Sequence, residues 1–166
     1  MQIGDTVLYG TTGVCRVSGE TERSIGGETK KYFVLEPLSD GKCTVFVPKD
    51  NEALLSKARK VLSKEEILEI IDSLPQKEEI WVEDAIARRE LFSEILKSGN
   101  RARQMLLIRS LYNKQQQKIT EKKRLHITDE RMLDELVRLL HDEFSAVLGI
   151  EEDEVAAFIA SRLEKN

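Results

Sequence analysis

The chain has 166 residues and a formal net charge of −4, with 34% charged, 40% hydrophobic and 5% aromatic side chains. This balance predicts a globular protein rich in helix and excludes the apolar-poor composition of disordered chains. No stretch approaches the roughly 18 apolar residues of a membrane span, and the first residues lack the pattern of a secretory leader. We therefore expect a cytoplasmic protein that does not bind a membrane.

Residues 1 to about 60 contain short segments of alternating side chains separated by glycine turns, which is typical of strands. The pairs Gly26-Gly27 and Asp40-Gly41 supply residues that tolerate the positive φ of two-residue hairpin loops. Four or five such strands predict a small antiparallel barrel that closes only loosely. A strand left at its edge either offers backbone groups to a partner or is simply solvated. The expected strands are DTVLYG, GVCRVSGETER, KKYFVLEP and CTVFVP.

From residue 61 onward the apolar period changes to about 3.6 residues, which predicts helices. Ser63 and Glu66 form a capping box, and Ser98-Gly99-Asn100 ends one helix and caps the next. Strands followed by helices predict an α+β fold, with a small β-barrel in residues 1–60 and an all-α domain of about five helices in residues 61–166. The expected helices run from Ser63 to Pro75, over 79–97, from Asn100 to about Lys118, after a cap at Thr128, and after Gly149.

The residue types that support catalysis or metal binding occur without the necessary spacing. His126 and His141 have no neighbours that complete a metal site or a nucleophile–base pair, and no glycine-rich phosphate loop is present. Cys15 and Cys43 lie within expected strands without Cys-x-x-Cys spacing, so we expect both to be small buried apolar groups. The sequence therefore predicts no enzyme, no metal, no cofactor and no small-molecule substrate.

Charge is distributed unevenly along the chain. Residues 97–124 carry nine basic side chains and one acidic side chain, whereas residues 125–166 carry four and eleven. The basic segment either binds a polyanion or pairs internally with an acidic helix. At helical spacing, one expected exposed stripe suited to backbone phosphates contains Arg103, Ser110, Lys114 and Gln117, and residues 122–124 would extend it.

Several motifs resemble those of the CarD/CdnL family of bacterial transcription regulators. They are IGDTVLYGTTGVCRV, GETKKYFVLEP and VFVP in the first domain, and RRELF, LKSGN and IRSLY in the second. The resemblance implies a Tudor-like or SH3-like barrel that binds the RNA polymerase β subunit. It also implies a helical domain that contacts promoter DNA, weakly and non-specifically, at the upstream edge of the melted bubble. The expected protein is a monomeric regulator of transcription initiation without a cofactor.

The polymerase-binding residues that this resemblance implies are Arg23 and Phe46. Arg23 stands where the family places a basic contact to the β subunit, in the strand before the Gly26-Gly27 turn. Phe46 replaces a second basic contact of some members, so part of the expected interface is apolar or displaced.

In the helical domain the correspondence is partial. The family's tryptophan wedge corresponds to Ala85, four residues after Trp81, and Glu90 and Glu130 stand where members that contact DNA tend to carry lysine. These three departures favour a second function, a protein adaptor that docks on polymerase and has little affinity for DNA. The basic segment favours DNA contact, which we prefer. The expected DNA-binding residues are Trp81, Arg88, Arg89, Arg103 and Lys114.

Trp81, the only tryptophan, allows two interpretations. On a helix over 79–97 it faces the same side as Ala85, a position suited to insertion at an unstacked base step. The same helical arc holds Leu91 and Phe92, as it would for a core residue. Arg88 lies on that arc too, and a buried guanidinium needs a partner, which indicates that this end of the helix is not fully covered. Both interpretations remain open.

Overall fold

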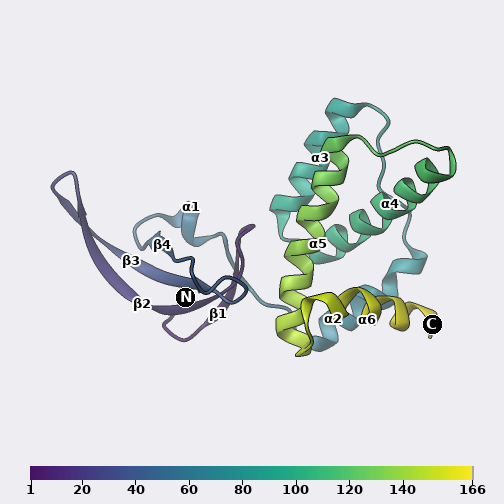
Figure 1. Ribbon diagram of the computed structural model, residues 1–166. Helices are drawn as coiled ribbons and strands as arrows, with labels where there is room; N and C mark the ends of the chain where they lie inside the picture. The colour runs from purple at the N-terminus through teal and green to yellow at the C-terminus, as the bar shows by residue number, and fades with distance from the viewer. Residues whose placement is uncertain (166) are drawn as a thin grey trace. The chain divides into compact units, whose positions relative to one another are not determined.

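The computed structural model describes residues 1–165, which divide into two compact units, Met1–Leu62 and a second unit that begins at Ser63 (Figure 1). The first unit is an antiparallel sheet and the second is helical, so the predicted α+β fold is confirmed. The two units are described separately below. Within the described residues no helix combines the length and the apolar character needed to cross a membrane.

The first unit is one five-stranded antiparallel sheet in the order β4-β3-β2-β1-β5. Because β4 and β5 lie at the two ends of this order, the sheet has two edge strands. A single turn of helix, α1, connects them and is capped by Asn51, whose side chain accepts from the N–H of Leu54 at 3.0 Å. The elements are β1 (Thr6–Tyr9), β2 (Gly13–Ile25), β3 (Glu28–Pro37), β4 (Val45–Pro48), α1 (Glu52–Leu55) and β5 (Ala58–Lys60).

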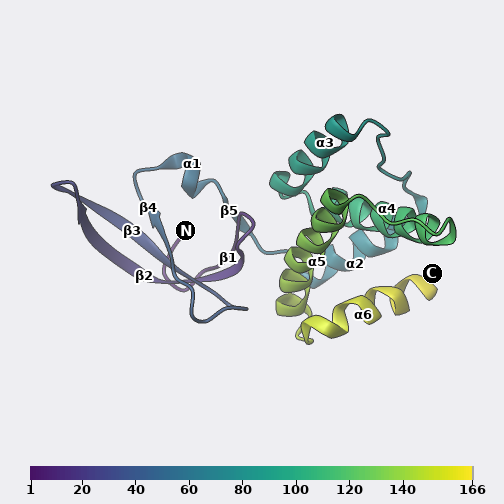
Figure 2. The same cartoon turned by 45° about the horizontal axis from the view of Figure 1, so that its top comes forward.

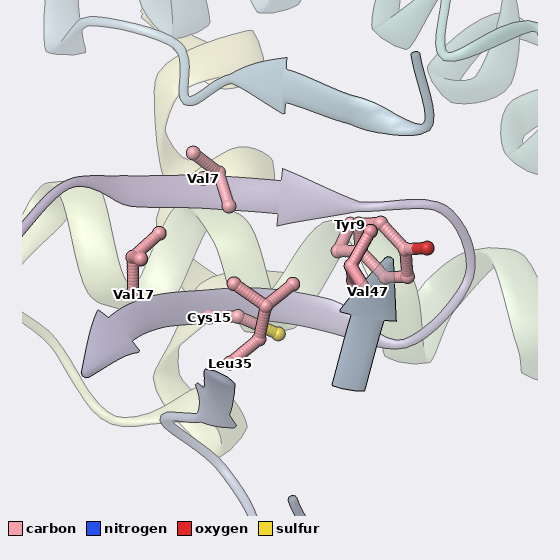
Figure 3. Close-up of a cluster of buried hydrophobic side chains, with 6 residues drawn as sticks. All are labelled: Val7, Tyr9, Cys15, Val17, Leu35 and Val47. Carbon is pink, nitrogen blue, oxygen red and sulfur yellow. The ribbon is translucent and has the colours of Figure 1, made fainter. Parts of the chain in front are cut away.

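The core of this unit lies on one face of the bent sheet, where alternate residues of four strands meet (Figure 3). Cys15 and Val17 of β2 and Leu35 of β3 are completely buried, and the register pairs Val17 with Leu35. Burying aliphatic side chains such as Val17 and Leu35 contributes about 1.5–3 kcal/mol each. The cluster comprises Val7, Tyr9, Cys15, Val17, Leu35 and Val47.

The β2–β3 hairpin is much longer than the strands beside it and extends past this core as a two-stranded ribbon (Figures 1 and 2). Every residue from 22 to 31 is exposed, so neither face of the ribbon's end is covered. Gly26 and Gly27 turn the chain with φ values of 62° and 87°, a conformation that β-carbons disfavour. The predicted two-residue turn is therefore confirmed at this hairpin.

Over residues 63–165 the second unit consists of five α-helices and a short 3-10 turn. Figure 2 shows how the helices are arranged. Its core is formed by completely buried side chains that include Phe92 of α3, Leu107 of α4 and Phe144 of α5. The elements are α2 (Lys64–Ser73), η1 (Leu74–Gln76), α3 (Ala85–Ser98), α4 (Arg101–Thr120), α5 (Ile127–Leu148) and α6 (Glu152–Glu164).

Most of the predicted helix ends are confirmed. Ser63 and Glu66 form the expected capping box, with hydrogen bonds of 3.1 and 2.7 Å. Gly99 and Gly149 adopt the left-handed conformation, at φ values of 66° and 69°, and end α3 and α5. Asn100 caps α4 by accepting from the N–H of Arg103 at 3.1 Å.

The predicted helix over 79–97 is wrong at its start, because α3 begins at Ala85. Asp84 is the N-cap and accepts from the N–H of Ala87 at 2.8 Å. The segment before it is held extended by Arg88, which donates to the backbone carbonyls of Val82 and Glu83 that a helix would use internally. Trp81 therefore lies in a loop, and the helical-face argument that placed it beside Ala85 does not apply.

Three smaller predictions are also corrected. Cys43 is exposed and precedes β4, which begins only at Val45. The β3–β4 connection spans residues 38–44 instead of a two-residue loop, because Asp40 builds a turn of its own by accepting from the N–H of Lys42 at 3.2 Å. Helix α5 is capped by His126, whose ring accepts from the N–H of Thr128, so Thr128 is already helical.

Candidate functional site

The outer face of the ribbon and β4 carries the two predicted polymerase-binding residues. The guanidinium of Arg23 lies 3.6 Å from the ring centroid of Phe46, although Arg23 is on β2 and Phe46 is on β4. The register pairs Val34 with Phe46, and alternate residues of β3 share a face, so Tyr32 and Val34 lie on the same side. The structure thus brings the two predicted residues into direct contact.

This outer face combines a positive charge with a partly exposed apolar floor. Arg23 is exposed, whereas Tyr32, Val34 and Phe46 are half-buried, and β4 beside them is an edge strand. Contact with an aromatic ring holds the guanidinium in place while its N–H groups stay available to an acidic partner. Tyr32 and Val34 were not identified from the sequence as members of this face, although both lie in the expected strand KKYFVLEP.

In the helical unit, Trp81 is half-buried and held by several neighbours. Its ring centroid lies 6.2 Å from that of Phe92, and its indole N–H donates to Glu83 at 3.1 Å. The charged groups of Arg88 and Lys114 lie 4.5 and 4.8 Å from the ring centroid. Trp81 is therefore neither a fully buried core residue nor an exposed ring without contacts that could insert into DNA unhindered.

Arg88 is almost completely buried and its charge is used inside the protein. The Nε and Nη2 atoms donate to the two carboxylate oxygens of Asp129 at 3.2 and 3.1 Å, and Nη1 donates to two backbone carbonyls. Its side chain is 10% exposed and that of Asp129 is 6% exposed. This placement argues against the expected DNA contact at Arg88 and gives it a structural role. Arg89 next to it is exposed.

Much of the basic segment pairs internally. Arg101 forms a bidentate ion pair with Glu143, at 3.0 and 2.9 Å, and Glu143 is completely buried. Arg109 donates to the carbonyls of Leu74 and Lys77. Further internal pairs are Arg103 with Glu94 at 3.4 Å, Lys114 with Glu83 at 3.9 Å, and Lys123 with Glu121 at 3.5 Å. Arg103 and Lys114, two expected DNA contacts, therefore already face acidic side chains.

The predicted exposed stripe on α4 is interrupted. Ser110 is 1% exposed, and its hydroxyl accepts from the N–H of Ile80 at 2.8 Å and donates to the carbonyl of Leu106 at 2.8 Å. That contact ties the loop before α3 to α4. The stripe cannot run through Ser110, and Lys114 is one of its remaining members.

Several cations of the helical unit have no side-chain ion pair or side-chain hydrogen bond within residues 1–165. Four of them are Arg89 of α3, Lys118 near the end of α4, and Lys122 and Arg124 in the connection to α5. Lys122 adopts a left-handed backbone with φ of 58°, which is uncommon outside glycine. Three of these four lie between residues 118 and 124, so the α4–α5 connection holds a group of available positive charges.

The first unit can be assigned by comparison with known families. A family model described as the CarD-like/TRCF RID domain matches residues 1–59. The chain carries a CarD-like RID domain. The match confirms the resemblance seen in the motifs of the first domain, and it indicates interaction with the RNA polymerase β subunit and a role in transcription. No curated protein matches the chain.

The RID domain contains Arg23 and Phe46 together with the whole outer face described above. The helical unit, which holds all five expected DNA-binding residues, lies beyond the match. Among the residues that the structure describes, no group of three histidine, cysteine or acidic side chains is arranged to hold a metal ion. His126 serves as a helix cap, and burial lowers the pKa of His141.

Proposed function

We propose that this chain regulates transcription initiation by binding the RNA polymerase β subunit through its RID domain and contacting promoter DNA through its helical unit. The RID domain is the observation that carries the proposal. DNA contact at the upstream edge of the bubble would change the stability of the open complex. The protein would act by binding alone, in the cytoplasm, as a monomer.

The polymerase-binding step is supported by the exposed Arg23 above Phe46. We expect Arg23→Glu to weaken binding of the full chain to RNA polymerase about tenfold, because a rim charge on a partly apolar face contributes on the order of 1–2 kcal/mol. The expected loss is measured by titrating polymerase with labelled protein. Phe46→Ala is expected to act in the same direction, because it removes the surface that positions the guanidinium.

Arg16→Glu is the matched control, because Arg16 is also an exposed arginine of β2 but lies on the part of the strand that pairs with β1. This substitution should change the affinity for polymerase by no more than about twofold relative to the wild type, because it lies on the surface away from the interface. Equal losses for Arg23 and Arg16 would indicate a general charge effect and would remove Arg23 from the interface.

The DNA-binding step is supported by the unpaired side chains of Arg89, Lys118, Lys122 and Arg124. Contacts between such side chains and phosphates read no sequence, so free duplex should bind weakly, with a dissociation constant of roughly 10⁻⁴–10⁻⁶ M. Docking of the RID domain on polymerase would raise the effective concentration of the helical unit near the promoter. A weak interface is therefore sufficient for a regulator that polymerase brings to its DNA.

We expect the affinity of the chain for duplex DNA to fall with salt, with a slope of log K against log salt of about −3 to −4 if all four cations meet phosphates. Replacing Lys118, Lys122 or Arg124 with alanine should reduce the slope by about one unit each. Glu90→Lys adds a cation beside Arg89 and should make the slope of log K against log salt steeper.

Arg103→Ala is the matched control for this experiment, because Arg103 already pairs with Glu94. Its effect on the slope should be smaller than that of Arg124→Ala. A change in the stability of open promoter complexes that is the same at every salt concentration and in all these variants would support the adaptor function and contradict DNA contact. The internal pairing of Arg101, Arg103 and Lys114 is the observation that favours the adaptor.

A further inference from the structure

The helical unit contains an open cavity of about 540 Å³ beside Trp81. Its walls come from the loop before α3, from Lys118 of α4 and from the connection that leads into α5. Trp81 and Ile127 supply aromatic and aliphatic surface, and Ile127 is 56% exposed although it is a large apolar residue. The volume is within the range of small-molecule sites, which is roughly 300–1,000 Å³.

The charges around this cavity leave two cations available. Asp129 is neutralised by Arg88, and the carboxylate of Glu83 faces Lys114 and the indole N–H of Trp81. Lys118 and Arg124 also line the cavity, and neither has a partner in residues 1–165. A ligand that enters the cavity would therefore meet two uncompensated positive charges.

A further donor comes from the cap of α5. The backbone N–H of Thr128 donates to Nδ1 of His126 at 3.3 Å, and its hydroxyl lies 2.8 Å from the same atom. Because Nδ1 accepts, the neutral ring carries its proton on Nε2. His126 lines the cavity and is exposed, so this second ring nitrogen can donate to a ligand oxygen.

We propose that this cavity binds a nucleoside phosphate, with the phosphate between Lys118, Arg124 and His126 and the base against Trp81 and Ile127. A phosphate has enough oxygens to accept from all three side chains at once, and a base offers a flat surface to an aromatic and aliphatic wall. Two sources share this chemistry: a free nucleotide, and an unpaired nucleotide of a DNA strand. The second source rests on the proposed function, whereas the first does not.

Titration of the full chain tests the proposal, with calorimetry and with the fluorescence of Trp81, the only tryptophan, as readouts. The probes are ADP, a short oligothymidylate, adenosine and inorganic pyrophosphate. ADP or the oligothymidylate should bind more tightly than adenosine and pyrophosphate and should change the emission of Trp81. Lys118→Ala and Arg124→Ala should each weaken that binding about tenfold, as the loss of one charged hydrogen bond does.

Lys64→Ala is the control, since Lys64 is exposed on α2 and does not line the cavity. Tighter binding of ADP identifies a free nucleotide, and tighter binding of the oligothymidylate identifies an unpaired strand. The proposal is overturned if neither binds, if pyrophosphate binds as well as both, or if the Lys118 and Arg124 variants bind like the Lys64 variant. Failure of the proposed function is a separate result, namely an unchanged lifetime of open promoter complexes when the wild-type chain is added.

Discussion

Replacing Arg88 with alanine is expected to lower the free energy of unfolding by about 3–5 kcal/mol, because the change leaves the buried Asp129 carboxylate without its partner. The same substitution frees the carbonyls of Val82 and Glu83 and removes a cation from the ring of Trp81. Denaturant unfolding followed by circular dichroism measures the loss. Tryptophan emission should also move to longer wavelength as the loop before α3 opens.

Arg89→Ala provides the matched control, since Arg89 is the next residue of α3 and is exposed. It should change the stability by no more than about 0.5 kcal/mol. The double change Arg88→Met with Asp129→Leu should recover much of the loss, because it removes both buried charges together. A stable Arg88→Ala variant with weakened DNA binding would contradict the structural role of Arg88 and would support its expected contact with DNA.

The second large effect is expected at Glu143, which is completely buried and accepts two hydrogen bonds from Arg101. Glu143→Ala should cost about 3–5 kcal/mol of stability, because it removes the carboxylate that neutralises a nearly buried guanidinium at the start of α4. Thermal and denaturant unfolding measure this directly.

Glu94→Ala is the corresponding change in an exposed pair. Glu94 contacts Arg103, and the two side chains are 67% and 43% exposed. Exposed ion pairs contribute about 0–1 kcal/mol, so this variant should unfold close to the wild type. Similar losses in both variants would mean that burial of the Arg101–Glu143 pair does not govern its contribution.

Local sequence signals were sufficient for most of the architecture. The capping box at Ser63, the glycines that end α3 and α5, and the Gly26-Gly27 turn each depend on residues within a few positions, so one sequence contains the whole signal. The fold class followed from the change in apolar period near residue 60. The short elements α1 and β5 were missed, because three or four residues carry no measurable period.

The start of α3 could not be deduced from local preference alone. The segment before Ala85 has helix-forming residues, but Arg88 binds its carbonyls and Ser110 accepts from the N–H of Ile80, thirty residues earlier. These are tertiary hydrogen bonds that compete with the helix. Asp84 before Ala85 was the one local signal, since aspartate is a preferred N-cap.

The basic segment shows a related limit for the candidate site. A charge count over residues 97–124 cannot distinguish Arg101, which reaches a buried glutamate on α5, from Arg124, which has no partner among the described residues. Only the packing of α4 against its neighbours separates structural cations from available ones. Internal pairing is therefore seen for part of the segment. Binding of a polyanion by the other cations stays a prediction, which the binding experiments above test.

The ribbon formed by β2 and β3 has a consequence for amide hydrogen exchange. Its end lacks a covered face, so the amides around Gly26 and Gly27 should exchange through local fraying, whereas those near Cys15, Val17 and Leu35 should exchange only when the unit unfolds. A partner lying across the ribbon would slow the first group and leave the second unchanged. The unmodified chain can thus report where polymerase binds it, and how quickly, without any substitution.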